Sequence, residues 1–164
     1  MARKRTSVLF VCLGNICRSP LAEGVFRHLV VDHGLTDLFE IDSAGTGDYH
    51  IGAPPDRRAA HVARAHGITL TGRARAFEPA DLDRFDHVLV LDRSILRDIR
   101  RVQEAAGRGS AKIRLLRQLD PQAGDDLDVP DPYYGGAGGF ERVYGMIAQA
   151  CRHLLDELTS VPHG

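Results

Sequence analysis

The residues of this 164-residue chain that could do chemistry gather in one short stretch, where five residues separate Cys12 from Arg18. A cysteine thiolate is a strong nucleophile, and a guanidinium matches the oxygens of a phosphate group with two parallel hydrogen bonds. Between them, Gly14 permits tight backbone curvature and Asn15 tolerates a left-handed conformation. The spacing therefore predicts an anion-binding loop with a nucleophile at its base, which suits covalent attack on phosphorus.

The segments on either side of this loop indicate where it lies. Residues 8–11 form a continuous apolar run, as expected of a strand buried on both faces. Ser19, Pro20 and Glu23 indicate the start of a helix. Ligands of α/β proteins bind outside the carboxyl ends of strands, and a helix N-terminus favours an anion. The Gly-Lys-Ser/Thr sequence of an ATP-binding loop is absent from this stretch.

Strands and helices alternate along the rest of the chain. We expect strands over 8–11, 38–43, 86–92 and 112–116, and helices over 19–33, 56–66, 94–105 and 140–158. This alternation predicts an α/β fold, a three-layer sandwich in which a central four-stranded parallel sheet carries helices on both faces. The length suits a single domain, residues 1–164.

The composition is that of an ordinary globular protein, with 21 basic and 22 acidic residues and a net charge of -1. This balance gives no overall attraction to nucleic acid or to an anionic membrane, so anion recognition must be local. Three cysteines are too few, and odd in number, for a secreted disulfide framework. We therefore expect the protein in the reducing cytoplasm. The basic start and the apolar run after it superficially resemble a signal peptide, but that run is too short, and no run is long enough to span a membrane.

A phosphoryl-transfer mechanism also needs an acid for the leaving oxygen, and Asp131 is the candidate. It precedes Pro132 on a loop that also carries Tyr133 and Tyr134. The Asp-Pro pair is equally compatible with plain turn chemistry. The two tyrosines predict the wall of an apolar, ring-accepting pocket, with ordinary packing as the alternative.

Cys151 falls on the inner face of the last predicted helix, where a packing role is expected.

At these positions the chain resembles the low-molecular-weight protein tyrosine phosphatases. The resemblance rests on a phosphate-loop motif and an acid-loop motif, Val11-Cys12-Leu13-Gly14-Asn15-Ile16-Cys17-Arg18-Ser19-Pro20 and Asp131-Pro132-Tyr133-Tyr134. It continues through Asp42-Ser43-Ala44-Gly45 and other segments, and so covers nearly the full length. The fold that it implies is the phosphotyrosine phosphatase I-like sandwich.

The resemblance implies a role for each site residue. Cys12 attacks phosphorus, Arg18 holds the phosphoryl oxygens together with the loop amides, and Asp131 protonates the tyrosyl oxygen before it activates water. Ser19 supports the thiolate, and Asn15, aided by Ser43, holds the loop in shape. The implied phosphate- and substrate-binding residues are Leu13, Gly14, Asn15, Ile16, Cys17, Arg18, Tyr49, Tyr133 and Tyr134, with His50 at the mouth. Many relatives place a histidine in the supporting network where this chain has Gly72.

The implied function is hydrolysis of phosphotyrosine and other aryl phosphates through a phosphocysteine, without metal or cofactor. The expected protein is a cytoplasmic monomer that acts on phosphotyrosine-containing proteins, binds phosphate or another oxyanion in its loop, and has no nucleic-acid or membrane partner. Bacterial relatives that act on phosphoarginine tend to have threonine at the position of Ile16 and a different aromatic in the acid motif. Ile16 and the paired tyrosines therefore favour phosphotyrosine over a protein arginine phosphatase activity.

Two further alternatives share the loop. A thiol-dependent arsenate reductase needs additional cysteines downstream, and none lies between Cys17 and Cys151. A catalytically silent phosphotyrosine-binding module would have no need of an acid at Asp131. Cys17 is close to Cys12 in the sequence, so we also expect a reversible disulfide that shields the nucleophile from overoxidation, with a second packing cysteine as the alternative.

Overall fold

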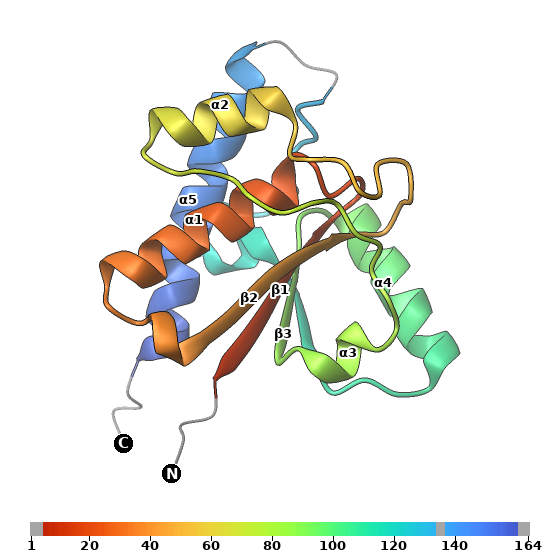
Figure 1. Cartoon of the computed structure of the whole chain (residues 1–164). Helices are drawn as coiled ribbons and strands as arrows, with labels where there is room; N and C mark the ends of the chain where they lie inside the picture. The colour runs from red at the N-terminus through yellow and green to blue at the C-terminus, as the bar shows by residue number, and fades with distance from the viewer. Residues whose placement is uncertain (1–4, 134–136, 161–164) are drawn as a thin grey trace.

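The computed structural model describes residues 5–133 and 137–160, and its centre is a four-stranded, wholly parallel sheet (Figure 1). The strands lie in the order β2-β1-β3-β4. Their bounds are Thr6–Cys12 for β1, Phe39–Gly45 for β2, His87–Val90 for β3 and Lys112–Leu115 for β4. All four predicted strands are therefore confirmed, and the sheet has the expected direction.

Helices cover both faces of this sheet, so the predicted three-layer sandwich is confirmed (Figure 1). One face carries α1 (Arg18–Asp32), α2 (Arg57–Ala65) and α5 (Ala137–Thr159). The other carries α3 (Asp81–Arg84) and α4 (Arg93–Ala106). Two 3₁₀ helices that the sequence patterns do not predict, Thr36–Leu38 and Leu116–Leu119, lie in connections.

Strand β1 is buried on both faces, as its apolar run predicts. Successive side chains of a strand point to opposite faces. Val8 and Phe10 accordingly join the core under α1 and α5, whereas Leu9 and Val11 join the core under α4. This central strand thus fixes the position of the loop that follows it.

Cys151 belongs to the buried face of α5, with no exposed surface. Burial raises the pKa of its thiol well above the ordinary value, so the group stays protonated at neutral pH. Its neighbours on the same face, including Val143, Ile147 and Leu154, are equally buried. These features support the packing role that the helical spacing predicts.

The carboxyl ends of the parallel strands meet at one edge of the sheet, and the loops there carry the predicted site. The loop of residues 13–17 joins β1 to α1, and Asp56 caps α2 by accepting a hydrogen bond from the Arg58 amide at 2.8 Å. Asp92 follows β3 and caps α4 by accepting a hydrogen bond from the Ile95 amide at 2.9 Å.

Among the described residues, none of the helices is long and apolar enough to cross a membrane.

Candidate active site

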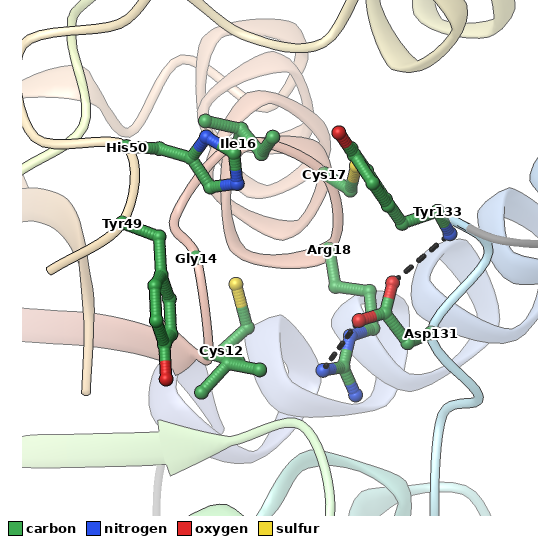
Figure 2. A pocket seen from close by; sticks show the side chains of 10 residues that line it. Cys12, Gly14, Ile16, Cys17, Arg18, Tyr49, His50, Asp131 and Tyr133 are labelled. Carbon is green, nitrogen blue, oxygen red and sulfur yellow. Dashed lines mark hydrogen bonds and ion pairs between the residues drawn. The ribbon is translucent and has the colours of Figure 1, made fainter. Parts of the chain in front are cut away.

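A pocket of about 390 Å³ opens at this edge of the sheet and contains the predicted nucleophile, arginine and acid (Figure 2). Its lining residues are Cys12, Leu13, Gly14, Ile16, Cys17, Arg18, Tyr49, His50, Asp131 and Tyr133. Asn15, Ser19 and Ser43, the predicted supporting residues, are buried behind the loop. Tyr134 lies outside the described residues. The structure therefore brings together side chains that are up to 121 positions apart in the sequence.

Three carbonyl groups at the loop face away from its centre, because they accept hydrogen bonds from neighbouring loops. These bonds are Thr46 N to Cys12 O at 3.0 Å, Gly47 N to Leu13 O at 2.8 Å and Asp56 N to Ile16 O at 2.8 Å. A trans peptide places its N–H opposite its carbonyl, so the amides of Leu13, Gly14 and Cys17 face inward. The Asn15 amide donates to Cys12 Sγ at 3.3 Å. The loop therefore surrounds the sulfur with donors suited to an anion.

Asn15 turns the loop in the left-handed conformation, with φ of 55°, the only described non-glycine residue with positive φ. Gly45 makes room for this turn. A Cβ at Gly45 would lie 2.7 Å from the Leu13 carbonyl oxygen and 3.1 Å from the Asn15 Cβ. The close approach of the two backbones thus requires glycine at position 45.

A chain of hydrogen bonds runs from Glu23 to the nucleophile, and the chemistry of each group fixes its direction. A carboxylate only accepts, so Ser43 donates its hydroxyl hydrogen to Glu23 Oε1 at 2.6 Å. Ser43 Oγ then accepts from Asn15 Nδ2 at 3.0 Å, and the other hydrogen of that amide goes to Ser19 Oγ at 2.8 Å. The Ser19 hydroxyl is left to donate to Cys12 Sγ at 2.9 Å. This donation favours the thiolate.

The orientation of the Asn15 amide has an independent anchor. The backbone N–H of Arg75, which can only donate, lies 2.9 Å from Asn15 Oδ1, so Nδ2 must face the two serines. Glu23 in turn pairs with Arg27, whose Nε lies 2.8 Å from Oε2. The sequence pattern of a helix start did not reveal this role of Glu23, which lies beyond the first turn of α1 and faces β2.

Gly72 lies beside this network, in the wall of a cavity of about 90 Å³. The cavity is also lined by Asn15, Pro20, Glu23, Asp42, Ser43, Pro55, Thr71, Arg73 and Ala74. Gly72 has φ of +89°, a conformation that L side chains rarely adopt. A Cβ at Gly72 would meet no heavy atom within 4 Å, and the Asn15 side of the loop is held by Ser43, Glu23 and the Arg75 backbone.

Arg18 is held rigidly below the loop. Its Nη1 donates to Asp92 Oδ2 at 2.6 Å and to the Val129 carbonyl at 2.9 Å, and its side chain is only 4% exposed. Burial alone would lower the pKa of Arg18, but Cys12 and Asp92 outweigh it and hold the pKa above its ordinary value. The only signal for the partnership with Asp92 was the position of this aspartate at the end of a neighbouring strand.

Asp131 stands at the open side of the pocket. The amide of Tyr133 donates to its Oδ1 at 3.0 Å, and its Oδ2 lies 3.7 Å from Arg18 Nη2. Its side chain is 38% exposed, which leaves the carboxyl accessible to both substrate and water. Figure 2 shows it on the same pocket as the Cys12 sulfur, as an acid for a leaving oxygen requires.

Aromatic and aliphatic side chains wall the mouth above the loop. Tyr133 is half-buried, and its ring centroid lies 6.0 Å from that of His50. Ile16 is buried in the wall, whereas Tyr49 lines the pocket but remains 75% exposed. The slot between these groups can accept a flat ring above the phosphate-binding loop.

The two cysteines of the loop differ in environment. Burial, with added repulsion from Asp56 and Asp131, raises the pKa of Cys17 to about 12, so Cys17 is a neutral thiol at pH 7. Cys12, by contrast, accepts from the Asn15 amide and contacts the Ser19 hydroxyl. Both thiols are free in the structure, and the disulfide between them stays a prediction.

Replacing Glu23 tests whether the hydrogen-bond network supports the nucleophile. In Glu23→Ala, Ser43 loses its acceptor and holds the Asn15 amide less firmly, so the rate at which Cys12 reacts with iodoacetamide at pH 7 should fall by about three- to tenfold. Glu23→Gln retains an acceptor oxygen and should lower this rate less. Glu40→Gln, at another glutamate paired with an arginine, is the matched control. An unchanged rate in Glu23→Ala would contradict a role of Glu23 in the network.

Comparison with known proteins agrees with this geometry along nearly the whole chain. The family model described as low molecular weight phosphotyrosine protein phosphatase matches residues 7–161. The low molecular weight phosphotyrosine protein phosphatase of Homo sapiens is 46% identical over 158 residues, which cover 96% of this chain and 99% of the human protein. The low molecular weight protein-tyrosine-phosphatase of Streptomyces coelicolor is 52% identical over 149 residues, 90% of either chain.

A solved structure is similar over a comparable span. The crystal structure of DARP, the Drosophila arginine phosphatase, superposes with a TM-score of 0.88 and 33% sequence identity. The match covers 93% of this chain and 98% of the Drosophila chain. The same architecture therefore carries proteins named for two different phosphorylated residues.

Proposed function

Because the chain belongs to the low molecular weight phosphotyrosine protein phosphatase family, we propose that it hydrolyses phosphotyrosine in proteins, and other aryl phosphates, through a phosphocysteine at Cys12. The observation that carries this proposal is the arrangement around one sulfur atom. Inward-facing amides and the fixed guanidinium of Arg18 surround Cys12, and Asp131 lines the same pocket. These are the parts that a two-step phosphoryl transfer requires.

The first step transfers the phosphoryl group to sulfur. The loop amides and Arg18 bind the three non-bridging oxygens, which places phosphorus in front of Cys12 Sγ. The thiolate attacks phosphorus, an S–P bond forms and the P–O bond to the ring breaks. The electron pair of that bond goes to the phenolic oxygen, which takes a proton from the Asp131 carboxyl group. The products of this step are a free phenol and a phosphocysteine.

The second step returns the enzyme to its starting state. Asp131, now a carboxylate, removes a proton from a water molecule that attacks phosphorus from the side the phenol has left. An O–P bond forms, the S–P bond breaks, and inorganic phosphate leaves with Cys12 again a thiolate. The Ser19 hydroxyl stabilises the departing sulfur in this step, because it is already oriented toward Sγ.

The rigidity of the loop supports this reaction. Arg18 is anchored through Asp92 and Val129, and the outward carbonyls are tied to neighbouring loops, so the donors need not reorganise when charge develops on the phosphoryl oxygens.

We place the reaction in the cytoplasm, since three cysteines are too few for a secreted disulfide framework. We assign it to a monomer, since the residues that the mechanism uses all come from one chain.

Variants of Cys12 and Asp131 test the proposed mechanism with p-nitrophenyl phosphate. Cys12→Ser should abolish turnover, and Asp131→Asn should lower kcat by about 10²- to 10⁴-fold because the acid is lost. Asp125→Asn, on the same connection but exposed and outside the pocket, is the matched control and should retain full activity. Full activity in Cys12→Ser would rule out a phosphocysteine at this residue.

Phosphoarginine is the second candidate substrate, because the structurally similar Drosophila protein is named an arginine phosphatase. Ile16 presents an apolar wall that offers no partner to a guanidinium. We expect Ile16→Thr to raise the ratio of kcat/KM for phosphoarginine to kcat/KM for phosphotyrosine, and Ile16→Val to leave it unchanged. Equal ratios in all three proteins would show that this wall does not set the selectivity.

Oxidation tests the role of Cys17. Peroxide converts the Cys12 thiolate to a sulfenic acid, and Cys17 can displace water from it to form a disulfide. Mass spectrometry after brief peroxide treatment should find the link between Cys12 and Cys17, and activity should return with a thiol reductant. In Cys17→Ala the loss of activity should become irreversible. Irreversible oxidation of Cys12 in the unmodified protein, without the link, would refute the protective role.

A further inference from the structure

A second concave surface, which the proposed mechanism does not use, lies along helix α2. It is a groove of about 800 Å³ lined by Pro54, Pro55, Arg57, Arg58, Ala60, His61, Val62, Arg64 and Phe140. Four of these residues are basic or can become so, and the described lining contains no carboxylate. The remaining lining residues are apolar or small. The groove therefore combines cationic edges with an apolar floor.

Three of the four cations of this groove are not paired with carboxylates, whereas Arg58 pairs with Asp56 at 3.1 Å. Arg57, His61 and Arg64 recur at helical spacing on the exposed face of α2. In the part of the chain that the structure describes, no ion pair joins these three to a carboxylate. Elsewhere, arginines such as Arg84 and Arg114 pair with glutamates. In a protein of net charge -1, this face of α2 is a local concentration of positive charge.

The groove adjoins the catalytic pocket. Asp56, which caps α2, donates its backbone N–H to the Ile16 carbonyl of the phosphate-binding loop at 2.8 Å. The guanidinium of Arg58 lies 5.3 Å from the centre of the Tyr133 ring, which lines the pocket, and 4.7 Å from that of Phe140, which lines the groove. A chain bound with its phosphorylated ring in the pocket can therefore continue directly into the groove.

We propose that this groove binds an acidic segment of the phosphoprotein substrate, next to the phosphotyrosine in the sequence. The proposal rests on the proposed function. Arg57 and Arg64 are seven residues apart on a helix, about 10 Å along its axis. That distance is spanned by about three residues of extended chain. Two aspartates or glutamates about three residues apart would meet both arginines, while their backbone rests on the apolar floor.

The expected contribution is modest and depends on salt. Each exposed ion pair contributes a factor of about two to five to affinity, and ionic strength screens it. The attraction acts on the encounter with substrate rather than on the bond changes, so it should be seen in kcat/KM at subsaturating peptide and leave kcat nearly unchanged. A small aryl phosphate does not reach the groove, so the cations of the groove should not raise its kcat/KM.

The experiment compares three phosphotyrosine peptides of equal length at low ionic strength. One has neutral flanks, and the other two carry glutamates on the N-terminal or the C-terminal side of the phosphotyrosine. The test variant is Arg57→Gln with Arg64→Gln. The matched control is Arg97→Gln with Arg100→Gln, which removes two exposed charges from α4 on the opposite face of the sheet (Figure 1). Melting temperatures and p-nitrophenyl phosphate turnover show that both variants remain folded and active.

We expect the peptide with one of the two acidic flanks to have a kcat/KM about tenfold above that of the neutral peptide, because two ion pairs form with Arg57 and Arg64. The Arg57/Arg64 variant should lose most of this gain, the Arg97/Arg100 variant should keep it, and high salt should remove it. No gain from either flank, or a gain that the Arg57/Arg64 variant keeps, would overturn the proposal. Turnover of the neutral peptide and of p-nitrophenyl phosphate would then still support the proposed function, whereas its absence for every phosphotyrosine substrate would refute that function itself.

Discussion

The hydrogen bonds of the Asn15 side-chain amide hold the rest of the site in place. Asn15 is the only described non-glycine residue with positive φ, and its amide joins the phosphate-binding loop to Ser19, Ser43 and the Arg75 backbone. The hydrogen bonds diverge from this amide, because Asn15 donates on one side to Ser43, which donates to Glu23, and on the other side to Ser19, whose hydroxyl faces the Cys12 sulfur. The loop is therefore both shaped and polarised before any phosphate enters it.

The parallel sheet supplies the positions that this network needs. Cys12 ends β1 beside Gly45 at the end of β2, and Asp92 follows β3, the strand on the other side of β1. Gly45 admits the loop backbone, and Asp92 holds Arg18 beneath it. Because all of these residues lie at the carboxyl edge, the fold can assemble an anion site from short local segments without a metal-ligand cluster among the described residues.

The sequence was most informative where the signal is local. The apolar run of β1 and the helical spacing of α4 and α5 predicted those elements, and the spacing of Cys12, Gly14 and Arg18 predicted the loop. Partnerships across the fold were missed, because Glu23 meets Ser43 twenty positions away and Asp92 meets Arg18 seventy-four positions away. The helix-start pattern placed Ser19 near the cap, but Cys17 occupies the cap position. The hydroxyl of Ser19 contacts Cys12 Sγ, the partner that the family resemblance implies for it. Such choices depend on strand register, which residue types alone do not reveal.

If phosphate passes through Cys12, the phosphocysteine intermediate can be detected directly. The protein would be mixed with excess aryl phosphate, denatured during turnover at a pH that preserves the S–P bond, and analysed by fragment mass spectrometry. One phosphoryl group on Cys12, with Cys17 unmodified, is the predicted result, since the pKa of Cys17 is raised to about 12 by its burial. A phosphoryl group on Cys17, or turnover with no phosphorylated cysteine at any time point, would contradict transfer through Cys12.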